Sequence, residues 1–265
     1  MTKAYRNYHT HTSRCKHASD TDREYVLSAL ENGYDELGFS DHSPWPYENG
    51  TVSICRMPVE QLEDYVSSVQ SLKAEFAGRI KIHMGLECEY YPKYYDWLQK
   101  QRDLYKLDYL ILGNHFQRDD EINCHYSHVR TPDLLLRYAE TAIAGMRTGL
   151  FAYLAHPDVS LASYPEFDKA CETMSRMICQ ASNEMHFPLE YNLQGKLYQD
   201  RHIYDGLEYP CLAFWKIAGE MGCEAIVGVD AHAASSLART DRIDEGWRIL
   251  GGYGCRMTDQ LPLKA

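Results

Sequence analysis

The sequence predicts an α/β protein whose parallel strands close into a barrel surrounded by helices. Short apolar runs alternate with longer amphipathic stretches along the chain, a pattern typical of a parallel sheet connected by helices. About seven such units follow one another without a linker rich in glycine, serine or proline, which favours a closed (β/α) barrel over an open sheet. The length fits one large domain or two small ones, and the absence of such a linker favours one domain over residues 1–265.

Seven segments are predicted as strands because they are short apolar runs. The segment YLILG at 109–113 is apolar throughout, as expected of a strand buried on both faces. The segments ELGFS at 36–40 and AIVGV at 225–229 each stand directly before a charged residue. In chain order, the predicted strands are residues 4–8, 36–40, 80–87, 109–113, 150–155, 188–192 and 225–229.

Six segments are predicted as helices because their apolar residues recur at helical spacing. In the first, Val26, Leu27 and Leu30 share one face, and Gly33 provides a C-terminal stop. The second begins at Pro58, a residue favoured in the first turn of a helix. In chain order, the predicted helices are residues 22–32, 58–77, 132–148, 167–185, 210–221 and 243–250.

Composition and charge limit the classes of partner. The net charge is -11 and the pI about 5.5, so nucleic-acid binding is not expected, although bound cations still permit a local phosphate site. No apolar run approaches the 18 residues of a membrane span, and the N-terminus lacks the apolar region of a signal peptide. Nine cysteines without a CxxC pair are interpreted as free thiols, and a cytoplasmic location is expected.

Residue types that bind metals follow the C-terminal end of nearly every predicted strand, the end that carries the working groups of a (β/α) barrel. His9 and His11 follow the first strand, and His17 lies in the next loop. The other candidates follow or end later strands: His42, Glu87, His115, His156, Asp230 and His232. A single histidine at a strand end is more often structural, but seven of the twelve histidines on one predicted face indicate a metal site.

The chemistry of this set indicates a cluster of ions. Imidazole nitrogens and carboxylate oxygens suit Zn, Mn or Fe, and the cysteines are not arranged to compete. Nine ligands exceed the roughly four that one zinc ion takes, so two or three ions are implied. Because carboxylates bridge metals and histidines mostly do not, Glu87 and Asp230 are the candidates to join adjacent ions.

In sequence order, these residues resemble the motifs of the polymerase-and-histidinol-phosphatase family, known as PHP. The combination is HxH, a following histidine, a DH pair, GxE, a late histidine, HP and DxH, extending from His9 to about Leu237. The segments GLECEY and GVDAH resemble family motifs most, and LEYNLQG at 189–195 is similar to stand-alone histidinol-phosphate phosphatases. Many relatives have a GSxH-like motif where this chain has LGNH at 112–115, so the glycine is displaced while the histidine is kept.

This resemblance implies a distorted barrel of seven βα units that holds three ions, divalent or of mixed valence. It implies catalytic roles for Glu87, Asp230 and His232. The ligand sets that it implies are His9, His11, Glu87 and Asp230 for the first ion, Glu87, His115 and His156 for the second, and His17, His42 and His232 for the third.

The expected reaction is hydrolysis of a phosphate ester. A hydroxide that bridges two ions is a strong nucleophile near neutral pH, because coordination lowers the pKa of water towards about 7. It attacks phosphorus in line with the leaving alkoxide, while the ions take up charge on the phosphate oxygens. Asp41 or Asp158 is expected to orient a ligand imidazole through its second ring nitrogen.

Arginines in the loops after the strands are candidates to close a fork on the phosphate. Arg14, Arg118 and Arg201 each lie in such a loop, where the alternative for each is a solvated surface charge. His125 and His128 share the loop of Arg118 and are interpreted as exposed, with lining of the site entrance as the alternative.

The leading interpretation is a metal-dependent phosphomonoesterase. The resemblance implies that it converts L-histidinol phosphate and water to L-histidinol and phosphate, in histidine biosynthesis. A second interpretation keeps the metals and changes the substrate to another small phosphate ester or a phosphotyrosyl protein. A nuclease or editing role is disfavoured by the acidic charge and the absence of an attached polymerase. A non-catalytic metal-binding module is disfavoured because no ligand of the set is lost.

Overall fold

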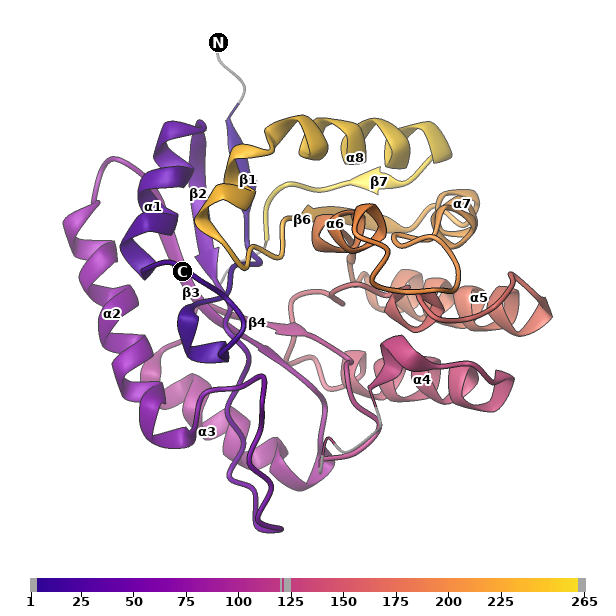
Figure 1. Ribbon diagram of the computed structural model, residues 1–265, viewed down its shortest axis with the longest axis horizontal. Helices are drawn as coiled ribbons and strands as arrows, with labels where there is room; N and C mark the ends of the chain where they lie inside the picture. The colour runs from indigo at the N-terminus through magenta and orange to yellow at the C-terminus, as the bar shows by residue number, and fades with distance from the viewer. Residues whose placement is uncertain (1–3, 120, 122–124, 262–265) are drawn as a thin grey trace.

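The strands lie together in the middle of the molecule and the helices lie outside them (Figure 1). The computed structural model describes residues 4–119, 121 and 125–261. The strands are β1 (Tyr5–Asn7), β2 (Tyr34–Phe39), β3 (Lys81–Cys88), β4 (Tyr109–Leu112), β5 (Leu189–Asn192), β6 (Glu224–Gly228) and β7 (Arg256–Met257). The helices are α1 (Asp22–Glu31), α2 (Leu62–Glu75), α3 (Tyr95–Tyr105), α4 (Pro132–Met146), α5 (Lys169–Met185), α6 (Leu193–Asp200), α7 (Leu212–Glu220) and α8 (Thr240–Tyr253).

Two parallel sheets are joined into a distorted barrel by isolated pairings. Their strand orders are β1-β2-β3-β4 and β5-β6-β7. Leu154 pairs with Leu112 at the end of β4 and with Leu189 in β5, which connects the two sheets. Beyond the end of β6, Ala231 pairs with Thr10, which closes the ring onto the segment after β1. The predicted barrel of βα units is therefore confirmed.

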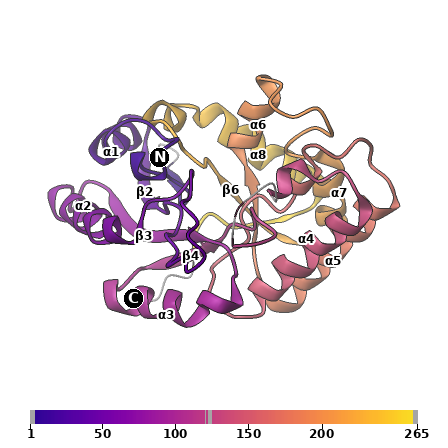
Figure 2. The same cartoon turned by 60° about the horizontal axis from the view of Figure 1, so that its bottom comes forward.

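The helices form the outer layer on both sides of the strands (Figure 2). Along one side α4 packs against α5, α5 against α7, and α7 against α8. Local signals fix where they begin: Thr21 and Glu24 form a reciprocal capping box at α1, and Asp168 accepts two backbone N–H groups at the start of α5. No helix within the described part of the chain combines the length and apolar character that a membrane crossing needs.

The structure departs from the predicted elements in a few places. The predicted strand at 150–155 is not a regular strand: it has only the isolated bridges of Leu154, although Ala152, Tyr153 and Ala155 form backbone hydrogen bonds with Leu110 and Leu112 in β4. Helices α3 and α6 and strand β7 were not predicted: α3 buries only Leu98, α6 begins directly at the end of β5, and β7 has two residues. Short or weakly apolar segments carry little periodic signal, so tertiary packing decides them. The eight cysteines within the described residues are free thiols, as predicted, and Cys124 lies outside them.

Tyr109 fills the barrel interior beneath the strand ends. Its ring is buried, and its single hydroxyl proton is shared between the carbonyl oxygens of Tyr8 at 2.7 Å and Phe39 at 3.1 Å. Two glycines make room for it: a Cβ on Gly38 would lie 2.9 Å from the Tyr8 Cα, and one on Gly85 would lie 2.8 Å from the Tyr109 ring. One side chain from β4 thereby ties the ends of β1 and β2 together across the interior.

We expect Tyr109→Phe to lower the free energy of unfolding by about 1–3 kcal/mol, because two buried carbonyl groups lose their donor. Urea unfolding followed by circular dichroism measures this change. Tyr153→Phe is the matched control, since Tyr153 lies in the same buried cluster and its hydroxyl makes no hydrogen bond to another described residue. Equal losses in the two variants would contradict a role for the Tyr109 hydroxyl.

Candidate metal centre

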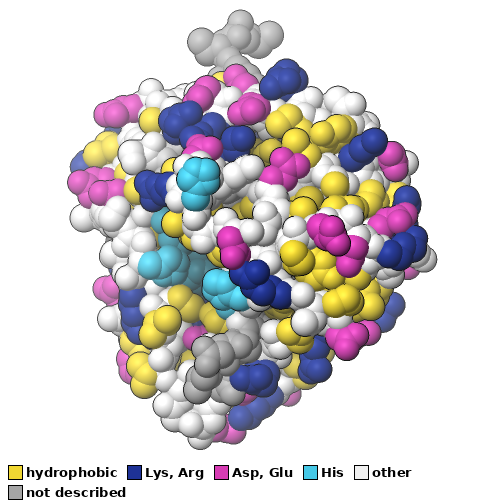
Figure 3. Space-filling view, turned by 45° about the vertical axis from the view of Figure 1, so that its right-hand side comes forward, with side chains coloured by type: hydrophobic (Ala, Val, Ile, Leu, Met, Phe, Trp, Pro, Cys, Tyr) yellow, Lys and Arg dark blue, Asp and Glu magenta, His cyan; other side chains and the backbone are white. Residues whose placement is uncertain are grey.

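The nine candidate ligands converge at the C-terminal ends of the strands. His9 and His11 follow β1, His42 follows β2, and Glu87 lies near the end of β3. The remaining members follow later strands or lie in a neighbouring loop: His17, His115, His156, Asp230 and His232. Figure 3 shows histidine side chains gathered in one hollow of the surface. The structure therefore brings together all nine side chains that the sequence indicates.

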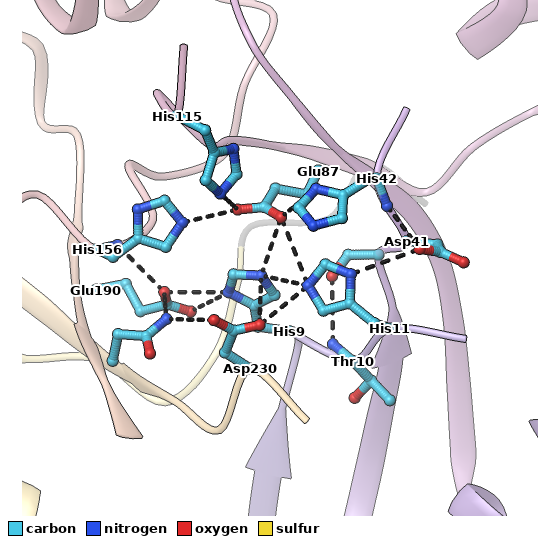
Figure 4. A network of polar contacts seen from close by, with 12 residues as sticks. His9, Thr10, His11, Asp41, His42, Glu87, His115, His156, Glu190 and Asp230 are labelled. Carbon is cyan, nitrogen blue, oxygen red and sulfur yellow. Dashed lines mark hydrogen bonds and ion pairs between the residues drawn. The ribbon is translucent and has the colours of Figure 1, made fainter. Parts of the chain in front are cut away.

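The carboxylate of Glu87 stands between several imidazoles (Figure 4). Its Oε1 atom lies 2.9 Å from His156 Nε2 and 3.2 Å from His115 Nε2. Its Oε2 atom lies 3.0 Å from His42 Nδ1. One carboxylate thus faces two separate groups of nitrogen atoms, the arrangement expected of a residue that bridges two ions.

His9 and His11 point at Asp230 as well as at Glu87. Asp230 Oδ1 lies 3.0 Å from His11 Nε2 and 3.4 Å from His9 Nε2. The two Nε2 atoms are 3.2 Å apart, and both lie 3.5 Å from Glu87 Oε2. The ligand atoms of His9, His11 and Asp230 lie within 4.8 Å of one another, as do those of Glu87, His115 and His156.

A third group forms beside these two. The Nε2 atoms of His17 and His232 are 2.9 Å apart, and a nitrogen of His42 lies within 4.8 Å of both. Two imidazole nitrogens that face each other share one proton at most. These three are among five overlapping groups of closely spaced ligand atoms within the described residues, so the division of the ligands between separate ions stays a prediction.

The donor set fits metal ions. Three buried atoms of the cluster make no hydrogen bond of good geometry among the described residues, namely His42 Nδ1, Glu87 Oε2 and Asp230 Oδ1, although each lies 3.0 Å from an atom of another candidate ligand. Buried polar atoms normally have partners, so unpaired atoms that converge need an explanation such as a bound ion. Nitrogen and carboxylate oxygen ligands suit Zn, Mn or Fe.

The electrostatic environment of the centre favours protonation states that can bind a metal ion, such as a deprotonated Glu87 and a neutral His232. Burial acts to raise the pKa of Glu87, but the neighbouring His115 and His9 outweigh it and hold this pKa well below its usual range. Burial lowers the pKa of His232 to about 3, and the charge of His11 acts in the same direction, so this imidazole is neutral. Burial also acts to lower the pKa of His9, yet the carboxylate of Asp230 keeps it raised. A cation there therefore displaces a proton as it binds.

Two carboxylates that the sequence analysis did not identify orient ligand imidazoles. Glu190 Oε1 lies 2.8 Å from His9 Nδ1, and Glu89 Oε1 lies 2.8 Å from His115 Nδ1. A carboxylate on Nδ1 fixes the tautomer that leaves Nε2 free to bind a metal. Both were detectable in principle: Glu89 stands two residues after Glu87 and so faces the same side of the extended chain, and Glu190 is the one charged residue of β5.

Of the two aspartates expected to orient an imidazole, Asp41 lies in place. Its Oδ1 atom is 3.5 Å from His11 Nδ1 and accepts the backbone N–H of His42 at 2.8 Å. The expectation for Asp158 is wrong. Its Oδ2 atom accepts the Cys211 backbone N–H at 2.6 Å and the Trp215 indole N–H at 3.1 Å, which ties the His156 loop to α7.

The three predicted phosphate arginines lie apart from one another. Arg14 is committed to ion pairs with Asp22 and Asp64, both at 2.8 Å, which corrects its proposed role. Arg118 is exposed and does not line the cavity over the cluster. Arg201 lines a neighbouring cavity of about 600 Å³ that also contacts His17 and His232.

The cluster opens into a cavity of about 400 Å³ with a largely aromatic wall. Beyond the candidate ligands, its lining includes Phe116, Glu121, His125, Tyr198 and Tyr204. His125 is half-buried, so the expectation that it is an exposed loop residue is wrong, whereas His128 is exposed. Both histidines line the cavity, which was the alternative interpretation. The cavity offers a shaped, partly apolar space for a small organic group next to the ligands.

Comparisons with known proteins agree on one family. The model of the PHP domain matches residues 7–194. A Deinococcus radiodurans protein named "probable histidinol-phosphatase" is 32% identical over 235 residues, which cover 84% of this chain and 85% of the relative. The histidinol-phosphatase of Bacillus subtilis is 36% identical over 121 residues, 43% of this chain and 45% of that protein.

A solved structure shares the fold. It is the histidinol phosphate phosphatase of Lactococcus lactis in complex with zinc, L-histidinol and phosphate, with a TM-score of 0.69 and 18% identity. The match covers 96% of this chain and 95% of that one.

The buried carboxyl of Asp158 predicts a pH-dependent stability. Burial raises its pKa to about 7, whereas the unfolded value is about 3.9. The folded state therefore keeps the proton between these values while the unfolded state loses it, so stability falls as pH rises and levels off above pH 7. We expect this group to lower the free energy of unfolding by about 2–3 kcal/mol between pH 5 and pH 8.

We expect Asp158→Asn to remove this fall in the free energy of unfolding between pH 5 and pH 8. The asparagine amide oxygen can still accept hydrogen bonds from the Cys211 backbone N–H and the Trp215 indole N–H, but it carries no charge that titrates. Urea unfolding of both proteins at each pH isolates the effect, since all other titrating groups cancel in the difference. A difference that stays constant from pH 5 to pH 8 would refute the raised pKa.

Proposed function

Because the chain belongs to the PHP domain family, we propose that it is a metal-dependent phosphomonoesterase that hydrolyses L-histidinol phosphate to L-histidinol and phosphate. The observation that carries this proposal is the convergence of imidazoles on Glu87 and Asp230 at one end of the barrel (Figure 4). Five of them are His9, His11, His42, His115 and His156, and His17 and His232 lie beside these. The proposed substrate is supported by the name of the Deinococcus relative, which matches most of the chain.

We propose three ions, one for each group of converging ligands. The first is held by His9, His11, Glu87 and Asp230; the second by Glu87, His115 and His156; the third by His17, His42 and His232. The spacing of ligand atoms within each group supports this assignment. When bound, such ions lower the pKa of a coordinated water and neutralise charge on the phosphate oxygens.

The protein's own part in this reaction is to hold the ligands in one protonation state and to shape the space beside them. Glu190 and Glu89 fix the rings of His9 and His115 through their Nδ1 atoms. Asp41 is proposed to do the same for His11. The wall formed by Phe116, Tyr198 and Tyr204 excludes water from the leaving group and receives its imidazole ring.

The two ends of the chain support its operation as a single unit over residues 1–265. Thr10 and Ala231 pair beside the centre, and at the opposite end of the barrel Arg6 forms an ion pair with Asp259 at 2.8 Å. Catalytic ligands therefore come from both halves of the sequence.

A second candidate substrate is a small ester that carries another anionic group. The cavity beside His17 and His232 is lined by Arg201, Arg239 and Arg242. Arg239 already pairs with Asp241 at 2.9 Å and Arg242 with Asp200 at 2.8 Å. Arg201 is proposed as the arginine that approaches the phosphate from this side.

We expect phosphate release from histidinol phosphate to exceed release from glycerol phosphate, phosphoserine and a phosphotyrosyl peptide in kcat/KM. The aromatic wall next to Glu87 favours a flat cationic ring over a small anionic group. Metal-reconstituted enzyme and a phosphate-release assay measure these ratios. Preference for another ester by more than about tenfold (~1.4 kcal/mol) would remove histidinol phosphate as the substrate.

We expect about three ions per chain in reconstituted protein, and Glu87→Gln to lower both metal content and kcat, the latter by at least about 100-fold. The neutral amide cannot bridge two cations, and metal content is read by plasma mass spectrometry. Glu36→Gln is the matched control, because Glu36 binds His83 at 2.8 Å away from the cluster. Intact turnover in Glu87→Gln, or fewer than two ions in the unmodified protein, would contradict the polynuclear centre.

A further inference from the structure

His125 borders the cavity over the cluster without belonging to any of the three ligand groups. Its ring lies 5.8 Å from the ring of His115 and meets Phe116 edge-on at 4.9 Å. It therefore faces the space next to the second group of ligands, where a substrate held by its phosphate extends its leaving group.

The backbone around His125 is anchored on both sides of the ring. His125 forms an isolated antiparallel pairing with Phe116, and the N–H of the following Tyr126 donates to the His115 carbonyl at 2.7 Å. Tyr126 itself is buried and packs edge-on against Tyr138. The position of the ring is thus tied directly to the segment that carries His115.

Local hydrogen bonds decide which nitrogen of His125 carries the proton. The backbone N–H of Ser127 donates to Nδ1 at 3.0 Å, and the Ser127 hydroxyl lies 2.7 Å from the same atom. A backbone N–H can only donate, so Nδ1 must accept. The proton of the neutral ring is therefore on Nε2, and a second proton on Nδ1 would point at the amide hydrogen.

The Nε2 atom is available to a ligand. It makes no hydrogen bond to another described residue, and it is not among the buried polar atoms that lack a partner. Because Ser127 occupies Nδ1 and His125 lines the cavity, Nε2 is the ring nitrogen that remains for a ligand in that space. The site thus contains a neutral, rigid hydrogen-bond donor that is not needed to hold a metal.

We propose that the Nε2–H group of His125 donates a hydrogen bond to the leaving oxygen of the phosphate ester and stabilises the charge that develops there. This inference rests on the proposed phosphatase function. When the bond from phosphorus to that oxygen breaks, the electron pair stays on the oxygen. The proton that finally makes the alcohol is the one lost by the attacking water, so His125 keeps its own.

A neutral imidazole suits this task. Its N–H can stabilise an oxygen that gains charge without first giving up a proton, as neutral histidines do toward carbonyl oxygens in other enzymes. Removing one such preorganised donor commonly costs about 100- to 1000-fold in kcat. The benefit grows with the basicity of the leaving oxygen, because a basic oxygen carries more charge as the bond breaks.

The dependence on leaving group provides the test. The alkoxide of histidinol is strongly basic, whereas p-nitrophenolate is a weak base that leaves without help. With metal-loaded enzyme, we expect His125→Ala to lower kcat about 100-fold for histidinol phosphate but less than about fivefold for p-nitrophenyl phosphate. In His125→Gln, the amide N–H reaches a position similar to that of Nε2–H. We expect its kcat for histidinol phosphate to be at least about tenfold higher than that of His125→Ala.

His128→Ala is the matched control in the same loop, and we expect it to change the rates of both esters by the same factor. Equal losses on both esters in His125→Ala at full metal content, without rescue by glutamine, would overturn the proposal. If an alkyl ester other than histidinol phosphate proves to be the preferred substrate, the proposed substrate fails, and the same comparison with that ester still decides the role of His125.

Discussion

The burial of Glu87 among imidazoles is the constraint on which the centre depends. A buried carboxylate is costly unless charges of the opposite sign surround it, and in this protein they come from histidines and from the cations that the histidines are suited to hold. The charged residues around the centre also need partners of opposite charge. Glu89 orients His115 and pairs with the buried Arg56, which in turn binds Glu121 at 2.7 Å on the cavity wall. The metal centre and the substrate cavity thereby belong to one chain of alternating charges.

The barrel makes this charge arrangement possible. Parallel strands end at a common level, so side chains far apart in the sequence meet there without long loops. Beneath that level the interior is filled by tyrosines and aliphatic residues, with Tyr109 hydrogen-bonded to the ends of two neighbouring strands. The buried apolar residues inside the barrel thus lie directly beneath the charged residues at the strand ends. The candidate metal-binding side chains are attached to the ends of these strands. Because the strands cannot slide past one another, the distances between these side chains change little.

Much of this arrangement was predictable, and the reasons differ from residue to residue. The histidines at the strand ends were identifiable from the sequence because residues that directly follow parallel strands all lie at the same end of a (β/α) barrel. Their positions in the sequence were therefore enough to predict that they lie close together. Glu190 and Glu89 were missed because an orienting carboxylate has no spacing rule of its own, although Glu190 lies within the buried strand β5 and Glu89 directly follows β3. Arg14 and Asp158 were misassigned for a related reason: position in a loop does not reveal whether Asp22, Asp64 or the indole of Trp215 already satisfies the charge. Such pairings depend on tertiary geometry.

The pairing of Thr10 with Ala231 has a consequence for the order in which the protein folds. The segment that carries the first two ligands is held against the segment that carries the last two, and these segments are more than two hundred residues apart. A nascent chain therefore exposes His9 and His11 on the ribosome long before Asp230 and His232 are synthesised. Contacts of such long range form late, since closing a large loop is entropically costly. Of the proposed ligand sets, the first and third are therefore completed only when the ring closes, whereas Glu87, His115 and His156 do not depend on that pairing.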